Sequence, residues 1–272
     1  MGQEDGSDTL RVIGFALVLF LIILMNEVTS YLTVSMDATT RGLIGTGVFF
    51  GNFLLMYLAL VVFLRRENGG DVTGLGIQFD QKTITHLVVG TIAGCVGAIA
   101  VYSIALFLGG DLRQVAEINA ELIATEVLIT VPVALFEELS YRGYLMTRME
   151  RVTGRNVAII GSSIWFSLLH FGWWIPLGSV PLHLVLIFTF NLFLGGVVLS
   201  FGYYWSGNRL WVPIAFHFAW NMLAYVLFPV FPSEPVLMPE VFQIEWGITT
   251  ILGFILGLSL IWLLLQELQK KK

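Results

Sequence analysis

Charged residues are scarce in this chain, and cysteine is almost absent. Lys, Arg, Asp and Glu together make up 12% of the 272 residues, and hydrophobic residues make up 57%. Soluble domains carry about 25% charged residues, so this composition excludes an ordinary soluble domain and is typical of a helical membrane protein. The single cysteine, Cys95, excludes an intrachain disulfide.

Two further absences narrow the class of protein. The Lys and Arg residues form no basic stripe and the net charge is −5, which argues against a nucleic-acid partner. Residues 1–8 are acidic, and the apolar run that follows has no small-residue cleavage site, so a secretory signal peptide is not expected there. We therefore expect the first apolar run to remain as a membrane span.

Apolar stretches long enough to cross a membrane dominate the sequence. A helix needs about 20 apolar residues to cross roughly 30 Å of hydrocarbon. The pattern predicts an all-α polytopic membrane protein with eight transmembrane helices, forming a single membrane domain over residues 1–272. The predicted spans are 12–32, 43–64, 84–108, 122–146, 156–175, 182–205, 210–228 and 242–265.

Basic residues alternate between the segments that connect these spans. Cytoplasmic segments carry an excess of Lys and Arg, so the basic side is predicted to be cytoplasmic. Both termini fall on that side, and the protein is predicted to be integral to the plasma membrane if the host is prokaryotic. Trp173 and Trp174 follow the fifth span, as expected for an aromatic belt at the opposite interface. The basic side holds Arg65, Arg66, Lys82, Arg148, Arg151, Arg155, Arg209, Lys270, Lys271 and Lys272, whereas the opposite side holds only Arg41 and Arg113.

Glycines four residues apart occur in several predicted spans. Such small-residue pairs allow two membrane helices to approach closely. With 28 glycines in the chain, the spacing arises readily by chance and does not say which pairs are buried. The pairs are Gly47 and Gly51, Gly90 and Gly94, and Gly253 and Gly257.

Three clusters of polar residues stand out within the apolar sequence of the predicted spans. An ionisable group at the centre of a membrane helix costs about 2.5–3.5 kcal/mol on insertion scales, so it is expected to serve function or assembly. Positions i and i+4 share a helix face, which allows the second carboxylate of the first cluster to pair with its arginine. The clusters are Glu137, Glu138 and Arg142 in span 122–146, Phe166 and His170 in span 156–175, and His217 and Asn221 in span 210–228.

The depths of the three clusters overlap. At a rise of 1.5 Å per residue, Glu137 lies roughly 16 Å from Arg148 and His217 roughly 12 Å from Arg209. By the same rise, His170 lies roughly 21 Å from the start of its span. We expect the three helices to bring these groups to one polar cavity in the inner and middle part of the bilayer. A structural ion pair and separately packed histidines remain the alternative at this point.

The order E-E-x-x-x-R, F-x-x-x-H and H-x-x-x-N resembles the CAAX protease and bacteriocin-processing enzyme family (CPBP, also called ABI). This family includes the type II CAAX prenyl endopeptidases, or Ras-converting enzymes. The resemblance implies an eight-helix intramembrane endopeptidase with a central cavity open to the cytosol and a catalytic core at about residues 84–265. It implies that Glu137 and His170 activate water, that His217 and Asn221 hold the oxyanion, and that Glu138, Arg142 and Phe166 support them.

The chemistry of these residue types agrees with that implication. Hydrolysis of a peptide bond needs a base for the attacking water and hydrogen-bond donors for the developing oxyanion. A nucleophilic mechanism is less favoured, because Cys95 has no partner motif and Ser140 has no evident Ser–Lys or Ser–His arrangement. The expected substrate is a membrane-bound peptide or a lipidated protein, held within the lipid bilayer.

Metal dependence stays open at this stage. Glu137, His170 and His217 could ligate zinc with water in the fourth position. The H-E-x-x-H pattern of many zinc proteases is absent. Members of the family are often labelled metalloproteases, but the resemblance also implies a glutamate mechanism without metal. We favour the mechanism that requires no cofactor.

Two other classes of function are compatible with the same residues. The chain could be a non-catalytic immunity or scaffold protein that binds a partner in the bilayer. It could also be a proton-coupled transporter, because Glu and His chains serve as proton relays. The sequence has no inverted repeat and no paired broken helices, which argues against the transporter.

Overall fold

The computed structural model describes residues 2–67, 70–171, 180–229 and 238–270. Within these ranges the regular structure is helical and contains no strand, which confirms the predicted all-α class. The α-helices are α1 (Gly2–Thr33), α2 (Ala38–Arg65), α3 (Thr83–Leu108), α4 (Ala120–Glu138), α5 (Thr147–Thr153), α6 (Arg155–Phe171), α7 (Leu182–Trp205), α8 (Trp211–Leu227), α9 (Pro239–Phe242) and α10 (Thr249–Lys270). Shorter elements are η1 (Val72–Leu75), η2 (Val115–Glu117) and the π-helix η3 (Leu139–Met146).

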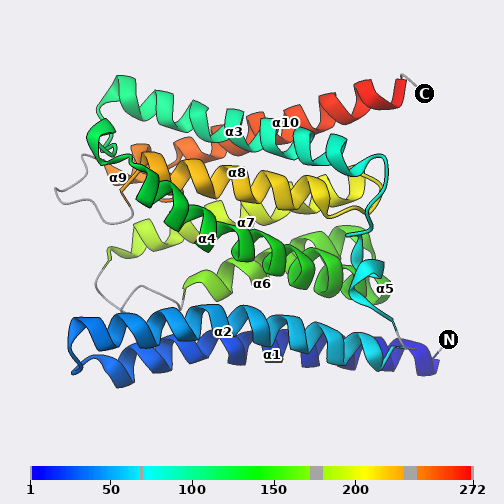
Figure 1. Cartoon of the computed structure of the whole chain (residues 1–272). Coiled ribbons are helices and arrows are strands. Elements are labelled where there is room, and N and C mark those ends of the chain that lie inside the picture. Colours follow the sequence, from blue (N-terminus) through cyan, green and yellow to red (C-terminus); the bar gives the residue numbers. More distant parts are fainter. Residues whose placement is uncertain (1, 68–69, 172–179, 230–237, 271–272) are drawn as a thin grey trace.

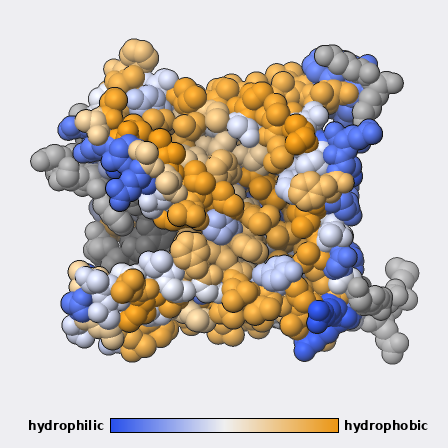
Figure 2. All heavy atoms as spheres, viewed as in Figure 1, coloured by the Kyte–Doolittle hydropathy of each residue, from blue (hydrophilic) through white to orange (hydrophobic). Residues whose placement is uncertain are grey.

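Five of these helices, α1, α2, α3, α7 and α10, are long and apolar enough to cross a membrane. Their outer faces expose many large hydrophobic side chains, and Figure 2 shows an apolar surface between two more hydrophilic ends. The protein is therefore an integral membrane protein. Helices α6 and α8 have only 17 residues each, and α4 carries four carboxylates, so none of these three counts among the five. They are the helices that bear the polar clusters.

The polar helices occupy the middle of the bundle. Figure 1 shows the α1–α2 hairpin along one side and α3 with α10 along the other, with α4, α6, α7 and α8 between them. Helix α4 packs against α8, and α6 packs against η3 and α7. Both termini lie at the end of the bundle that holds α5, whereas the α1–α2 turn and α9 lie at the opposite end (Figure 1). We call these the terminal end and the far end.

The predicted span 122–146 differs from a regular helix. Helix α4 ends at Glu138 and the chain continues as the π-helix η3, in which all eight residues from Leu139 to Met146 are buried. π-Helical segments are rare in proteins, and those that do occur are often found at functional sites. Helix α6 is described as far as Phe171, and the last part of the predicted span 156–175, with Trp173 and Trp174, lies outside the described residues.

The glycine pairs separate into two kinds. A Cβ atom added to Gly90 in α3 would lie 2.8 Å from Ala215 Cβ in α8, and one added to Gly253 in α10 would lie 2.8 Å from the carbonyl oxygen of Gly97. Close helix approach is therefore confirmed where α3 meets α8 and α10. The prediction of close helix approach is wrong for the pair in α2, because Cβ atoms at Gly47 and Gly51 would have nothing within 4 Å.

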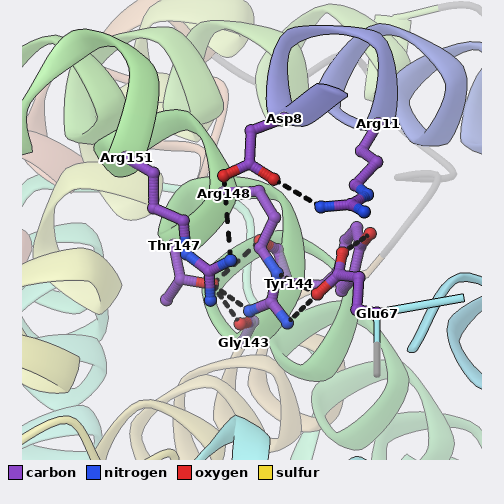
Figure 3. A network of polar contacts seen from close by, with 8 residues as sticks. All are labelled: Asp8, Arg11, Glu67, Gly143, Tyr144, Thr147, Arg148 and Arg151. Carbon is purple, nitrogen blue, oxygen red and sulfur yellow. Dashed lines mark hydrogen bonds and ion pairs between the residues drawn. The ribbon is translucent and has the colours of Figure 1, made fainter. Parts of the chain in front are cut away.

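A polar network ties η3 and α5 to their neighbours at the terminal end (Figure 3). Arg148 donates to Glu67 Oε2 from Nε at 3.0 Å and from Nη2 at 2.6 Å, and the Tyr144 hydroxyl donates to the other oxygen of Glu67. Burial would raise the pKa of Glu67, but the hydrogen bonds from Arg148 and Tyr144 bring it below its ordinary value. Asp8 of α1 lies 3.8 Å from Arg151 of α5. The network closes this end of the bundle around η3.

We expect Gly90→Ala to destabilise the protein, because overfilling a close helix contact costs about 1–3 kcal/mol. Gly51→Ala is the matched control, since a methyl group there meets nothing within 4 Å and a Gly→Ala change inside a helix gains about 0.5–1 kcal/mol. Thermal unfolding of the two variants in detergent measures the difference. Equal stability of both variants would contradict the close packing of α3 against α8.

Candidate active site

A fully buried carboxylate, Glu138, lies at the centre of the candidate site. One of its oxygens, Oε1, accepts a hydrogen bond from Arg142 Nη1 at 3.0 Å and lies 2.9 Å from His217 Nδ1. Glu138 and Arg142 have side-chain exposures of 0% and 1%, so water does not screen this pair. The predicted i, i+4 pairing is present, and the same carboxylate also reaches a second helix through His217.

The neighbouring carboxylate, Glu137, points into a cavity. Its Oε2 atom lies 3.7 Å from His170 Nε2 and 4.0 Å from His217 Nε2, and both distances exceed that of a direct hydrogen bond. This buried oxygen has no hydrogen-bond partner among the described residues. A buried acceptor without a protein partner is costly unless water or a ligand satisfies it.

Each histidine presents its Nε2 atom to Glu137 because its other ring nitrogen is already engaged. His170 Nδ1 lies 2.7 Å from the carbonyl oxygen of Phe166. A carbonyl oxygen only accepts, so Nδ1 carries the hydrogen and Nε2 of the neutral ring keeps its lone pair. In the same way, the Glu138 carboxylate beside His217 Nδ1 assigns a hydrogen to that nitrogen.

Phe166 orders several of these groups at once. Its ring lies under the Arg142 guanidinium at 4.3 Å, a favourable distance for a cation–π contact. Its ring centroid is also 4.3 Å from the imidazole of His170 and 5.0 Å from the ring of Tyr141. The F-x-x-x-H spacing therefore places an aromatic ring and a backbone acceptor one helical turn before the histidine.

The four predicted catalytic residues lie around one cavity of about 660 Å³. Asn221 follows His217 by one turn of α8, and both side chains line the cavity together with Glu137 and His170. Of the predicted supporting residues, Phe166 also lines the cavity, whereas Glu138 and Arg142 lie behind its wall. The structure thus brings together side chains from α4, α6 and α8.

The cavity also has carboxylates that the sequence did not single out. Glu126 lies three helical turns before Glu137 on α4, and Glu245 lies between α9 and α10 with a φ of 65°. Asn191 holds this segment by donating from Nδ2 to the carbonyl oxygens of Glu245 at 2.7 Å and Gly247 at 3.0 Å. The available signal for Glu245 was a lone carboxylate at the start of the predicted span 242–265.

The possible zinc ligands Glu137, His170 and His217 do face one another. However, no group of three or more His, Cys, Asp or Glu side chains in the described part of the chain has an arrangement that could hold a metal ion. No step below is assigned to a metal.

The central part of the chain matches a known protein family. Residues 119–223 match the family model described as type II CAAX prenyl endopeptidase Rce1-like. The matched segment includes every residue of the three motifs, so the resemblance seen in the sequence is confirmed for this part of the chain. The family is one of proteases. No curated protein matches the sequence.

We expect Arg142→Gln to destabilise the protein strongly, because removing one partner of a buried ion pair costs about 3–5 kcal/mol. The double variant Glu138→Gln/Arg142→Gln should recover part of this loss, since no uncompensated buried charge remains. Thermal unfolding of the single and double variants in detergent measures the coupling.

Arg155→Gln is the control for this series. Arg155 pairs with Glu150 at 3.2 Å, but its side chain is 61% exposed, so its loss should cost less than about 1 kcal/mol. If Arg142→Gln were no less stable than Arg155→Gln, the pair with Glu138 would not have the stabilising role described here.

Proposed function

We propose that this protein is an intramembrane endopeptidase in which Glu137 and His170 activate water to hydrolyse a peptide bond of a membrane-associated substrate. The observation that carries the proposal is the unpartnered Oε2 atom of Glu137, which lies on the wall of a cavity opposite His170 Nε2. The protease family match of residues 119–223 supports the same reaction class.

The proposed membrane arrangement has eight spans. The five apolar helices would be joined by α4 with η3, by α6 and by α8, whose polar residues face the middle of the bundle. The concentration of Lys and Arg at the terminal end supports a cytoplasmic location for both termini. Residues 1–272 then form a single membrane domain around the catalytic cavity.

Glu137 and His170 suit the activation of water because both present acceptor atoms to the same point. A water oxygen about 2.8 Å from both atoms fits across their separation of 3.7 Å, donating one hydrogen to each. Its lone pair would then attack the carbonyl carbon of the peptide bond, and the pair would receive the released proton.

His217 and Asn221 suit the stabilisation of the resulting oxyanion. The amide of Asn221 has two N–H donors, and His217 donates from Nε2 in its protonated form. The Glu138 carboxylate at 2.9 Å from His217 Nδ1 would stabilise that positive charge. Transfer of the proton from the Glu137–His170 pair to the amide nitrogen would break the C–N bond, release the amine product and leave a new carboxylic acid.

Glu138, Arg142 and Phe166 are proposed to position these groups without touching the substrate. Glu138 fixes the ring of His217, and Arg142 keeps that carboxylate compensated. Phe166 fixes the ring of His170 through its backbone carbonyl. Small errors in the position of catalytic groups reduce rate, so this support is expected to matter for turnover.

The proposed substrate is a prenylated CAAX-type C-terminus or a membrane-bound peptide precursor. A non-catalytic immunity or scaffold protein is the alternative. Such a protein would bind a partner in the same cavity and would not need the Glu137 carboxylate as a base. A proton-coupled transporter is the weaker alternative. The proposed mechanism requires no cofactor, and a zinc-dependent mechanism is the competing hypothesis.

Replacing Glu137 with Gln should lower the rate of peptide cleavage at least about 100-fold, because general-base catalysis contributes about 10²–10⁴. The assay compares purified wild type and variant on a farnesylated CAAX peptide and on membrane-extract peptides, with and without a chelator.

Glu121→Gln is the matched control for this assay, since Glu121 is an exposed carboxylate in the first turn of the same helix. Full cleavage by folded Glu137→Gln would rule out the proposed mechanism. Loss of wild-type activity with chelator, restored by zinc, would favour the metal-dependent alternative.

His217→Ala should lower kcat more than it raises KM, because an oxyanion donor acts mainly in the transition state. Removal of one such donor costs about 10²–10³ in kcat. Steady-state kinetics on the same peptides separates the two parameters. A change confined to KM would assign His217 to substrate binding instead.

A further inference from the structure

Glu245 is a buried carboxylate that the proposed chemistry does not use. It is 8% exposed and lines both the catalytic cavity and a smaller hollow of about 40 Å³. His217 and Asn221, the proposed oxyanion donors, line the same two spaces. Glu245 therefore lies where the two spaces meet, beside the groups proposed to hold the reacting carbonyl oxygen.

The backbone around Glu245 is held by specific contacts. Its N–H donates to Thr250 Oγ1 at 2.8 Å, and its carbonyl oxygen accepts from Asn191 Nδ2 at 2.7 Å. The next residue, Trp246, stacks on Phe188 with ring centroids 4.3 Å apart. These contacts keep Glu245 at a φ of 65°, in the left-handed region that L side chains rarely adopt. Residues held in such conformations by their surroundings cluster at binding and catalytic sites.

Burial makes the charge of Glu245 costly. A buried carboxylate is tolerated when a cation or hydrogen-bond donors compensate it. Its oxygens form no ion pair with a Lys, Arg or His side chain in the described ranges. Residues 68–69, 172–179 and 230–237, which lie outside those ranges, contain no Lys, Arg or His.

The neighbours of Glu245 do not supply the compensating charge. The charge of protonated His217 would act on Glu245, but Nδ1 of this ring already lies 2.9 Å from Glu138. The indole N–H of Trp220 also acts on Glu245, but it is a neutral donor. Glu137 adds a further negative charge. A cation that entered the cavity would therefore meet an uncompensated carboxylate.

The cavity wall as a whole carries more negative than positive groups. Glu126, Glu137 and Glu245 line it, whereas Arg41 is the single Lys or Arg among its described lining residues. Arg41 is exposed and forms no ion pair with a carboxylate in the described part of the chain. Tyr225 lies near enough to the three carboxylates for their charges to act on its hydroxyl group. A cavity lined mainly by one sign of charge raises the local concentration of the opposite sign.

We infer that Glu245 binds a cationic side chain of the substrate, a Lys or Arg within two residues of the cleaved bond. The inference rests on the proposed protease function and narrows its substrate class to polypeptides with a basic residue beside the cut. Ammonium and guanidinium groups carry only donors, which match a carboxylate, and charge-assisted hydrogen bonds of this kind are strong. The position of Glu245 beside His217 and Asn221 keeps the bound cation near the reacting carbonyl group.

Thermal unfolding in detergent separates binding from packing. Glu245→Gln should unfold at a temperature no lower than that of the wild type, because no ion pair in the described structure is lost. Glu138→Gln is the matched comparison, since it removes a buried carboxylate that pairs with Arg142 and should lower the unfolding temperature. A fall in Glu245→Gln as large as that in Glu138→Gln would assign Glu245 to packing and overturn the inference.

A binding measurement tests the cation site without cleavage. The full chain with Glu137→Gln is titrated calorimetrically with the acetylated and amidated peptides Ala-Leu-Lys-Leu-Ala and Ala-Leu-Gln-Leu-Ala. The Lys peptide should bind at least about tenfold more tightly, as expected for a hydrogen bond to a charged group. Adding Glu245→Gln should remove the difference. Equal or undetectable binding of the two peptides, or a difference that survives Glu245→Gln, would overturn the inference.

Cleavage kinetics distinguish a substrate site from support of His217. The cut bond of the best peptide in the assay above is located by mass spectrometry, and Lys, Gln or Glu is placed at each of the two positions on either side. Wild type should prefer Lys over Gln by at least about tenfold in kcat/KM at one position, and Glu245→Gln should remove this preference mainly through KM. Equal loss of kcat for Lys and Gln peptides would assign Glu245 to the support of His217 and overturn the inference. Glu121→Gln, which changes an exposed carboxylate, should leave the preference unchanged.

The two proposals fail in different ways. If wild type cleaves no peptide but tighter binding of the Lys peptide depends on Glu245, the protease function fails and the cation site stands. If Glu137→Gln abolishes cleavage but Glu245→Gln keeps the preference of the wild type, the protease function stands and the cation site fails.

Discussion

The hydrogen-bonded chain Arg142–Glu138–His217 is the constraint on which the rest of the site depends. A carboxylate with no exposure to water is tolerated only if its charge is compensated, and one oxygen of Glu138 meets both a guanidinium and an imidazole. Because these groups come from η3, α4 and α8, the pairing also fixes how the helices pack. The neighbouring carboxylate, Glu137, is then left without a protein partner and faces the cavity.

The packing of the helices and the positions of the candidate catalytic groups depend on backbone contacts as well as on side-chain contacts. Phe166 contributes its ring to Arg142 and its carbonyl oxygen to His170, so one residue of α6 positions groups of two helices. Glycines of α3 and α10 bring these helices close to α8 from the other side. Helix α8 is therefore held between a polar contact and an apolar contact, which restricts the place where His217 and Asn221 meet the cavity.

The sequence predicted the parts of the structure that depend on local pattern. The apolar lengths placed spans 84–108 and 182–205 close to α3 and α7, and the overlapping depths of Glu137, His170 and His217 anticipated their meeting. Span 122–146 continues as a π-helix after Glu138, and Glu245 reaches the cavity on an irregular segment held by Asn191. Such features depend on tertiary contacts, which no helical period encodes. The glycine spacing likewise could not distinguish buried pairs from the open pair in α2.

Because η3 is a π-helix, the number of residues in this segment affects the geometry of the site. A π-turn has more residues than an α-turn and so changes the angular phase between the residues before and after it. In this protein it sets the rotation of Arg148, which reaches Glu67, relative to Glu137, which reaches the cavity. Insertion or deletion of one residue within 139–146 would rotate one group away from its partners even with every side chain retained. The number of residues in this segment is therefore as much a determinant of the site as their identity.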